Sequence, residues 1–188
     1  MRYEKGRKDA SRRKIIEVAS ERFRSDGIAA TGLATVMSDA GLTNGAFYPH
    51  FKSKAELVRE TVVAAIESQS DQMRQMMAAG GLEAAINAYL SPEHRDSPDK
   101  GCTFAALLPE LARQPLETRS AYSDRLLAMT REIASRLPAR TEDPEAAALA
   151  IYATLVGTLQ LARVVEGTAL SDRILAAGAD AARALARN

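Results

Sequence analysis

The stretch GLTNGAFYPHF, from Gly41 to Phe51, concentrates aromatic side chains in a chain that has few of them. Phe47, Tyr48 and Phe51 fall within five positions, although Phe, Tyr and Trp together make up only 5% of the sequence. Pro49 interrupts the run, and lysines follow it at positions 52 and 54. A buried core alone needs no such grouping, so the stretch indicates a surface with a specific task.

The residues around this stretch predict two short helices joined by a tight turn. One helix is expected after Thr31, a good N-cap residue, with apolar side chains at positions 33, 36, 37 and 40 on its inner face. Gly41 and Leu42 form the turn, and Thr43 caps a further helix that Pro49 limits to little more than two turns. Two short helices with a glycine-containing turn between them are typical of a helix-turn-helix motif.

A second helix as short as this suits the major groove of DNA. An α-helix with its side chains is about 10–12 Å across, and the groove is about 12 Å wide. Thr43, Asn44 and Gly45 occupy the exposed N-terminal positions, from which a helix reaches base edges. The amide of Asn44 has the geometry to read an adenine, and its small neighbours let the helix approach closely.

The aromatic residues are expected to divide between core and surface. Phe47 and Phe51 lie four positions apart and face inward together, whereas Tyr48 points elsewhere with a phenol able to bond a phosphate oxygen. Lys52 and Lys54 lie at the start of the next helix, where backbone N–H groups and the helix dipole also favour a phosphate. In the simpler alternative, Tyr48 and His50 are ordinary surface residues at a helix end.

The whole sequence predicts an all-α fold of about nine helices, because apolar residues recur at helical spacing and alternating strand patterns are missing. The first helix is expected from Asp9 or Ser11 to Ser25, with Gly27 as its stop. A long fourth helix, capped by Ser53 and Glu56, is expected to reach about residue 79. Five more helices are expected over residues 82–90, 102–113, 114–137, 143–167 and from 171 onward, with a polar loop at 91–101.

Charge is distributed unevenly along the chain. The 188 residues are 46% hydrophobic, enough for a real core, and the formal net charge is only +1. Residues 1–54 hold 11 Lys/Arg and 6 Asp/Glu, whereas residues 55–188 hold 14 and 18, so the basic charge lies on the first segment. This distribution fits a nucleic-acid-binding end joined to a neutral or acidic body, or a solvated basic tail.

Several classes of protein are disfavoured by features that the sequence lacks. No uninterrupted apolar run approaches the roughly 20 residues of a membrane span, and the first residues have no apolar core like that of a secretion signal, so we expect a cytoplasmic protein with no membrane partner. One cysteine and two histidines provide neither an internal disulfide nor a plausible zinc site, and no cofactor is expected. P-loop, dinucleotide, HExxH and GxSxG motifs are missing, so we expect no enzymatic activity.

A specific pattern of residues runs through positions 10–62. It consists of a helix with Ile16, Ala19 and Phe23 followed by a set of turn and helix residues, namely Asp26-Gly27, Thr31, Val36, Ala40-Gly41-Leu42, Tyr48, Phe51, Lys52-Ser53-Lys54 and Leu57. This pattern resembles the N-terminal DNA-binding domain of TetR/AcrR-type transcriptional regulators. The later helices match that family only in number and length. The resemblance implies a helix-turn-helix DNA-binding domain over residues 1–54 and a helical effector-binding and dimerisation domain over residues 55–188.

The resemblance also implies roles for individual residues. Phosphate contacts are implied for Thr31, Tyr48 and Lys54, and positions at or near the bases for Thr43, Asn44, Gly45 and His50. Pro49 departs from the small or polar residue that is commoner there, which leaves the end of the recognition helix open. The implied assembly is a homodimer on a palindromic operator, in which residues 145–165 and 172–185 form a four-helix bundle with their mates. Gly157 and Gly178 suit close helix approach, either between subunits or within the chain.

Regulators of this type hold an effector among their middle helices. The candidate lining residues are mostly apolar or aromatic, namely Met73, Met77, Cys102, Phe104, Leu108, Tyr122 and Met129, with Met76, Tyr89 and Leu155 as further candidates. The same side chains would serve equally well as ordinary core. We therefore expect a repressor that a small apolar ligand releases from DNA. A DNA-binding architectural protein without a small-molecule effector is the alternative from another class.

Cys102 supports a second form of regulation. It follows a polar loop and lies near a predicted helix N-terminus and Lys100, where a thiolate is favoured. Its surroundings are similar to the Gly-Cys segment of a subset of the family, some of whose members respond to electrophiles or oxidants. The alternatives are a redox- or electrophile-sensing repressor and a cysteine that serves only as a small buried apolar residue.

Overall fold

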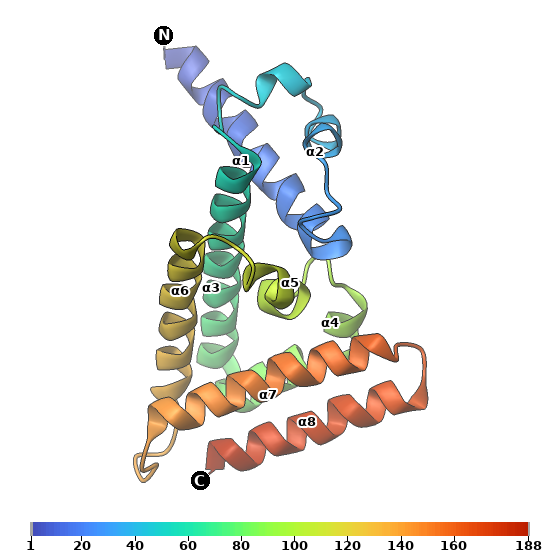
Figure 1. The fold of residues 1–188 in the computed structure, drawn as a ribbon. Coiled ribbons are helices and arrows are strands. Elements are labelled where there is room, and N and C mark those ends of the chain that lie inside the picture. The colour runs from blue at the N-terminus through green and yellow to red at the C-terminus, as the bar shows by residue number, and fades with distance from the viewer. Residues whose placement is uncertain (1, 188) are drawn as a thin grey trace.

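Helices account for all regular structure in the computed structural model, which describes residues 2–187 and, for side chains, residues 6–187 (Figure 1). Within residues 2–187, eight α-helices and one short 3₁₀ helix follow one another, so the all-α prediction of about nine helices is confirmed. The head, residues 2–53, contains α1 (Arg2–Asp26), α2 (Leu33–Asp39) and the 3₁₀ helix η1 (Asn44–Ala46). The body contains α3 (Lys54–Tyr89), α4 (Pro92–Asp96), α5 (Thr103–Leu111), α6 (Leu116–Ala134), α7 (Pro144–Val164) and α8 (Ala169–Arg187).

The helices of the body connect the head to a paired base. α3 descends from the head with α6 beside it, and α7 and α8 lie next to each other along the end of the molecule away from the head (Figure 1). The short helix α5 lies between the head and this base and contacts α1, α3 and α7. This placement makes α5 the link between the two ends of the fold.

The aromatic residues of the opening stretch form the core of the head. Phe23, Phe47 and Phe51 are among the largest fully buried side chains of the protein. The rings of Phe47 and Phe51 stack with their centroids 5.6 Å apart, so the predicted inward direction of both is confirmed. Burying each such side chain stabilises the fold by about 1.5–3 kcal/mol, which fixes the backbone that carries Tyr48 between them.

Three predictions about the head are wrong in detail. α1 begins at Arg2 and not near residue 9 or 11, because its first turns contain no proline and only one glycine, which a helix tolerates. The expected two-turn recognition helix is a single 3₁₀ turn, because a residue before proline is disfavoured in the α conformation and Pro49 has no N–H to continue the ladder. Gly32, not Thr31, precedes α2 as its N-cap.

The long helix α3 combines two of the predicted helices. Its N-terminus has the predicted capping box, in which the Ser53 hydroxyl accepts the Glu56 N–H at 3.2 Å and the Glu56 carboxylate accepts the Lys52 N–H at 2.5 Å. At Gly81 the backbone has φ of 72°, a conformation that glycine adopts without strain, and the helix axis changes there. The predicted division between residues 79 and 82 is therefore a kink within one element.

The predicted polar loop at 91–101 contains the helix α4. Pro92 occupies its first turn, where a missing N–H has no cost, and the Ser91 hydroxyl accepts the His94 N–H at 3.2 Å. The prediction was wrong because it treated Pro92 only as a helix breaker. α4 is important because it places His94 and Arg95 between α3 and α7.

The pairing of α7 and α8 is tight within one chain. A Cβ atom added at Gly178 of α8 would collide with the side chain of Thr158 on α7, whereas one added at Gly157 would meet nothing within 4 Å. Gly178 therefore serves packing inside the chain, and Gly157 faces outward. α7 is also the one helix of the described residues that is long and apolar enough to cross a membrane, and its buried side joins the core of the body.

Candidate functional site

The reading turn, residues 43–50, presents its polar side chains to solvent while its aromatic anchor is buried. Thr43, Asn44 and Gly45 are exposed, and Tyr48 keeps 70% of its surface. The Tyr48 ring meets the edge of Phe47 with centroids 5.4 Å apart, so the buried ring supports the exposed one. Four of the residues proposed for DNA contact thus share one projecting surface at the head.

Two other predicted DNA contacts have a structural use. The Thr31 hydroxyl is buried and donates to the Gly27 carbonyl at 2.7 Å. The half-buried Lys54 donates from its ammonium group to the Ile28 carbonyl at 2.6 Å. Both side chains hold the loop between α1 and α2, whereas Lys52 at the start of α3 is exposed. Of these three, Lys52 has the side chain best placed to meet a phosphate.

Positive charge from α1 lies beside the reading turn. The pKa of His50 is lowered by its partial burial and by the nearby charges of Lys8 and Arg12, so the imidazole is neutral at pH 7. The Arg12 guanidinium lies 4.8 Å from the centroid of the Phe51 ring and pairs with Glu60 of α3. The first turns of α1 therefore add cationic groups to the surface that carries Asn44 and Tyr48.

A cavity of about 170 Å³ lies within the body. It is bordered by residues of α3, α4, α5, α6, α7 and the segment before α5, namely Ile66, Gln69, Gln72, Met73, Met76, Ala88, Tyr89, His94, Lys100, Gly101, Cys102, Phe104, Met129 and Tyr152. Gln72 and Lys100 are exposed, whereas Met73, Phe104 and Met129 are buried. The space is therefore mostly apolar, with solvent-exposed side chains at its border.

The structure places only some of the predicted lining residues at this cavity. Met73, Cys102, Phe104 and Met129 border it, together with Met76 and Tyr89. Met77, Leu108, Tyr122 and Leu155 do not: Leu108 is exposed on α5, and the other three are buried in the core elsewhere. The polar lining residues Gln69, His94 and Tyr152 were missed because the search of the sequence was for apolar positions.

His94 fixes the wall of the cavity next to Cys102. Its Nε2 accepts the Cys102 N–H at 2.9 Å, and its Nδ1 lies 2.6 Å from the Tyr89 carbonyl, a pairing that requires a neutral ring with the proton on Nδ1. Burial lowers the His94 pKa, the bond to Tyr89 opposes this, and the charge of Arg163 adds to the lowering. The ring thus joins α4, the end of α3 and the start of α5.

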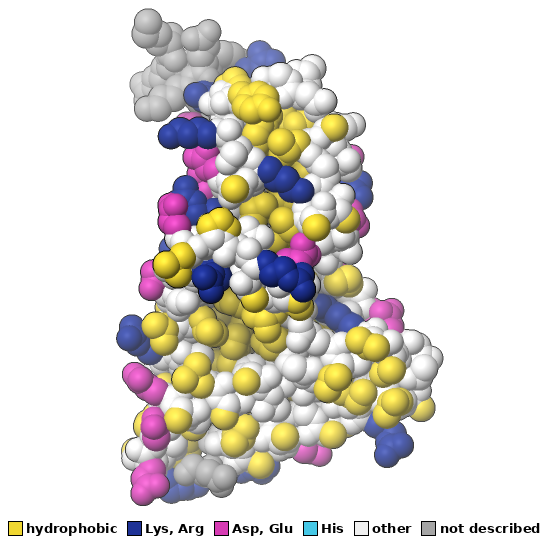
Figure 2. All heavy atoms as spheres, viewed as in Figure 1, with side chains coloured by type: hydrophobic (Ala, Val, Ile, Leu, Met, Phe, Trp, Pro, Cys, Tyr) yellow, Lys and Arg dark blue, Asp and Glu magenta, His cyan; other side chains and the backbone are white. Residues whose placement is uncertain are grey.

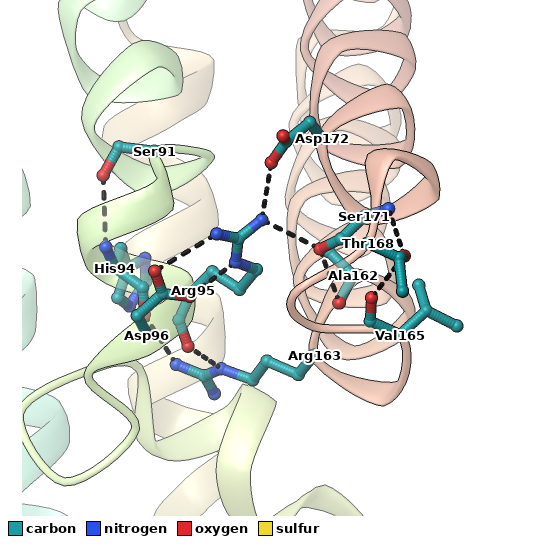
Figure 3. Close-up of polar contacts among 10 residues, drawn as sticks. All are labelled: Ser91, His94, Arg95, Asp96, Ala162, Arg163, Val165, Thr168, Ser171 and Asp172. Atoms are coloured by element: carbon teal, nitrogen blue, oxygen red, sulfur yellow. Dashed lines mark hydrogen bonds and ion pairs between the residues drawn. The ribbon is translucent and has the colours of Figure 1, made fainter.

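Arg95, the next residue of α4, ties this wall to the corner between α7 and α8 (Figure 3). Its buried guanidinium donates to the Ser171 hydroxyl at 2.9 Å and to the Asp172 carboxylate at 2.7 Å, and it also pairs with Asp96. Hydrogen bonds to the two carboxylates raise the already high pKa of Arg95, and Asp96 has the larger effect. From α7, Arg163 donates in return to the carbonyls of residues 94 and 95. The cavity wall and the base are therefore one hydrogen-bonded unit.

The Cys102 thiol is buried at the cavity, at the N-cap position of α5. Its Sγ lies 3.8 Å from the Tyr152 hydroxyl, and the latter has its pKa raised well above the usual value by burial and then by Cys102. Gly101 precedes it in a confined place, because a Cβ atom there would lie 2.8 Å from His94 Nε2. The thiol therefore faces a site of small-molecule size and not open solvent.

The far end of α5 is bonded to the head. Glu110 accepts backbone N–H groups from Ile28 and Ala29, which follow α1. The loop before α5 is also bonded to the head. Its Asp99 carbonyl accepts a hydrogen bond of 2.6 Å from the Arg24 side chain of α1. Burial lowers the pKa of Arg24 against the opposing charges of Glu21 and Asp99. The same short helix thus begins at the cavity and ends at the head.

Comparisons with known proteins agree with this arrangement. The family profile for bacterial regulatory proteins of the tetR family matches residues 15–61. TtgR, an HTH-type transcriptional regulator of Pseudomonas putida, is 49% identical over 49 residues, which are 26% of this chain and 23% of that protein. KstR2, an HTH-type transcriptional repressor of Rhodococcus jostii, is 23% identical over 127 residues, 67% of this chain and 62% of that protein. The alignments thus span less than two thirds of these relatives.

Solved structures of similar fold extend the likeness over the body. The reduced form of E. coli NemR superimposes with a TM-score of 0.74 at 16% identity, covering 90% of this chain and 95% of that one. A TetR-family transcriptional regulator from Cytophaga hutchinsonii gives a TM-score of 0.75 at 18% identity, covering 95% and 96%. The helix-turn-helix head and the helical body both follow the arrangement of this family, whose members are regulators and not enzymes. Residues 15–61 thus carry the DNA-binding domain of the tetR family of bacterial regulatory proteins, and the described chain has the fold of TetR/AcrR-type transcriptional regulators.

Proposed function

We propose that the chain is a dimeric repressor that binds a palindromic operator through its reading turn and leaves DNA when a small apolar molecule occupies the cavity. The observation that carries this proposal is the position of α5. Its N-cap residue Cys102 and Phe104 of its first turn border the cavity, and its last turn holds the loop between α1 and α2 through Glu110. A molecule that displaces the start of α5 therefore acts on the head through a helix of nine residues.

Base reading is assigned to the exposed tip of the reading turn. Asn44 is free to offer its amide to an adenine, with Thr43 and Gly45 beside it and His50 near the same surface. Tyr48 and Lys52 are assigned to phosphates, because a phenol and an ammonium group give position without base preference. Thr31 and Lys54 are left out of the direct contacts, because their polar groups hold the loop after α1.

The dimer is assigned to the outer faces of α7 and α8. Exposed apolar or small residues recur along α7 at helical spacing, namely Ala146, Ala150, Ala153, Leu161 and Val164, with the outward-facing Gly157 among them. Figure 2 shows hydrophobic side chains spread over this part of the body, with charged side chains mainly at its edges. A second copy of the same surface would cover these side chains by two-fold symmetry.

Operator binding followed by release tests the proposal. DNA bound by the purified protein is selected from a random pool, and fluorescence anisotropy then measures affinity for the selected site in the presence of small apolar compounds that raise the melting temperature. We expect a palindromic site and a loss of affinity with compounds that bind the cavity. Failure to bind any DNA even in dilute salt would overturn the proposal, and tight binding unaffected by such compounds would leave the architectural alternative.

A second form of release is supported by the location of Cys102. Its thiol borders the cavity, so a small electrophile that enters would meet the sulfur directly. In this alternative the electrophile is an α,β-unsaturated carbonyl compound. The Cys102 S–H bond breaks and its proton passes to solvent, the sulfur bonds to the β-carbon as the carbon–carbon π bond breaks, and the α-carbon takes up a proton from solvent. Cys102→Ser should still bind the operator but should resist release by a mild electrophile. Release of the variant at the wild-type rate would remove this alternative.

A further inference from the structure

The net positive charge of the head comes from the first half of α1. Residues 1–14 hold 7 Lys/Arg and 2 Asp/Glu, whereas residues 15–54 hold four of each. The DNA contacts assigned above lie in the reading turn and at Lys52, so they use none of this charge. The cations of α1 therefore form a surface that the proposed function has not yet employed.

α1 extends beyond the core of the head at this end. Its buried residues begin at Ile15, Ser11 and Arg12 are half-buried, and residues 6–10 are all exposed. A Cβ atom added at Gly6 would meet nothing within 4 Å. The first turns of α1 (blue) lie at the same end of the head as the segment that contains η1 (cyan), away from α7 and α8 (Figure 1). The projecting turns thus lie on the side of the molecule that carries the reading turn.

Arg12 fixes the position of α1 relative to the reading turn. Its guanidinium lies 4.8 Å from the centroid of the Phe51 ring and pairs with Glu60 of α3. Phe51 in turn stacks on Phe47, and the edge of Phe47 supports the Tyr48 ring. Arg12 is therefore packed against the same pair of rings that holds the exposed Tyr48 in place.

Lys8 lies one turn before Arg12 on the same face of α1. Four residues of an α-helix advance about 6 Å along its axis, so Lys8 continues the cationic face past the reading turn. Lys8 is exposed and forms no ion pair within the side chains of residues 6–187. Two like charges at this spacing repel each other, and Glu60 offsets only the charge of Arg12. A negative group beside Lys8 would remove the remaining repulsion.

The chemistry of this face favours DNA over a membrane surface. A basic helix that binds lipid also needs an apolar side to enter the bilayer. The apolar side of α1, with Ile15, Val18 and Phe23, is buried in the head, and the exposed residues 6–10 include only one apolar side chain, that of Ala10. Duplex DNA has one negative charge per about 1.7 Å of its axis, and this charge continues past any bases that a protein reads.

We propose that Lys8 and Arg12 form a second DNA contact, which binds backbone phosphates beside the bases that the reading turn contacts. This inference rests on the proposed function, because the reading turn must bind the operator for DNA to lie next to α1. The contact adds affinity and position without base preference. It also makes the stretch of DNA covered by each subunit longer than the sequence that the subunit reads.

Lys8→Gln tests the inference, because this exposed side chain can change without disturbing the packing of Arg12. Fluorescence anisotropy at several salt concentrations should show the slope of log affinity against log salt reduced by about 1 for each half-site, and operator affinity at 0.1 M salt reduced about tenfold or more. Hydroxyl-radical cleavage of the bound operator should show a protected stretch of backbone beside each half-site in the wild type that becomes exposed in the variant. Circular dichroism should show the same helical content in both proteins.

The matched control is Arg13→Gln. Arg13 is an exposed cation of the same helix, but it lies about 100° round the axis from Arg12. Its removal should leave the salt slope and the protected stretch unchanged. The inference is overturned if Lys8→Gln has the slope and protection of the wild type, or if the two substitutions weaken binding equally. Failure of the proposed function would appear separately, as a wild-type protein that binds no DNA at all.

Discussion

The Glu110 carboxylate accepts a hydrogen bond of 3.1 Å from the backbone N–H of Ile28, 82 positions away in the sequence. A second N–H, from Ala29, reaches the same carboxylate at 2.9 Å. Gly27 makes this approach possible, because it has φ of 88° and a Cβ atom there would lie 2.8 Å from Glu110 Oε1. One side chain of the body thus closes onto the loop that follows α1.

Glu110→Ala should both destabilise the protein and weaken communication with the head. We expect the free energy of unfolding to fall by about 1–3 kcal/mol, because two N–H groups lose a charged acceptor. Chemical denaturation measures this loss, and operator release by a cavity ligand should need more ligand than in the wild type. Glu142→Ala, at an exposed position before α7, is the matched control and should change neither quantity. Equal effects of the two substitutions would contradict the role given to Glu110.

Lys52→Ala should weaken binding to all DNA sequences alike. Loss of one phosphate contact reduces the slope of log affinity against log salt by about 1, which titrations at several salt concentrations measure. Arg119→Ala removes the same charge from an exposed position on α6 and should leave the slope unchanged. A slope that is the same in Lys52→Ala and the wild type would show that this ammonium group is not at a phosphate.

Asn44→Ala should relax base preference instead. A side chain that reads one base pair contributes about 1–3 kcal/mol of discrimination against the wrong base. Affinities for the selected operator and for single-base variants should therefore converge at one position of each half-site, with the salt slope retained. If the affinity of Asn44→Ala fell equally for all DNA sequences, Asn44 would contact the DNA backbone and not a base.

Stability should fall as the pH is lowered through the titration range of the histidines. Burial is the largest cause that lowers the pKa of both His50 and His94, whereas an unfolded chain titrates near its usual value of about 6.5. As the pH falls, the histidines of the unfolded state therefore bind protons before those of the folded state. The stability that the two neutral histidines contribute is complete above pH ~6.5 and is lost as the pH falls through the folded pKa values. Denaturation between pH 7.5 and 5.5 should show this loss in the wild type and a smaller one in His94→Asn. If His94→Asn lost as much stability as the wild type over this pH range, the role given to the His94 pKa would be contradicted.

Leu161→Lys should separate the subunits without unfolding them. Leu161 keeps 62% of its surface on the outer face of α7, where a lysine is tolerated in a monomer but places an unpaired charge in a dimer interface. Light scattering should report the mass of one chain, with the helical circular dichroism retained. Leu116→Lys, at a 70% exposed leucine on α6, is the matched control and should remain dimeric. A dimeric Leu161→Lys protein would assign the interface to another face.

The sequence predicted the head better than the body because local rules decide more of it. The spacing of Phe47 and Phe51 and the capping box of Ser53 and Glu56 depend on residues a few positions apart, and the structure has both. The shape of the reading turn was missed, because Pro49 acts on backbone conformation and not only on helix length. The role of Thr31 was missed because its partner, the Gly27 carbonyl, is fixed only after the loop has folded.

In the body, helical periodicity shows which residues face inward but not which of them border a gap. Met73 and Met77 lie one turn apart on α3 and both are buried, yet only Met73 reaches the cavity. That difference depends on how α4 and α7 pack against each other beside the cavity, through contacts such as that of the Arg163 guanidinium with the His94 carbonyl. Glu110 was equally invisible, because its partners lie more than 80 positions away.

In the proposed dimer, the two sides of α7 would serve two different neighbours. Tyr152 borders the cavity from one side of this helix, while Leu161 and Val164 point out of the other. In a dimer joined along that outer side, each bound effector lies about one helix diameter, roughly 10 Å, from the neighbouring subunit. Because α7 would then belong both to the cavity wall and to the subunit interface, a displacement of α7 by one bound effector would reach the neighbouring subunit.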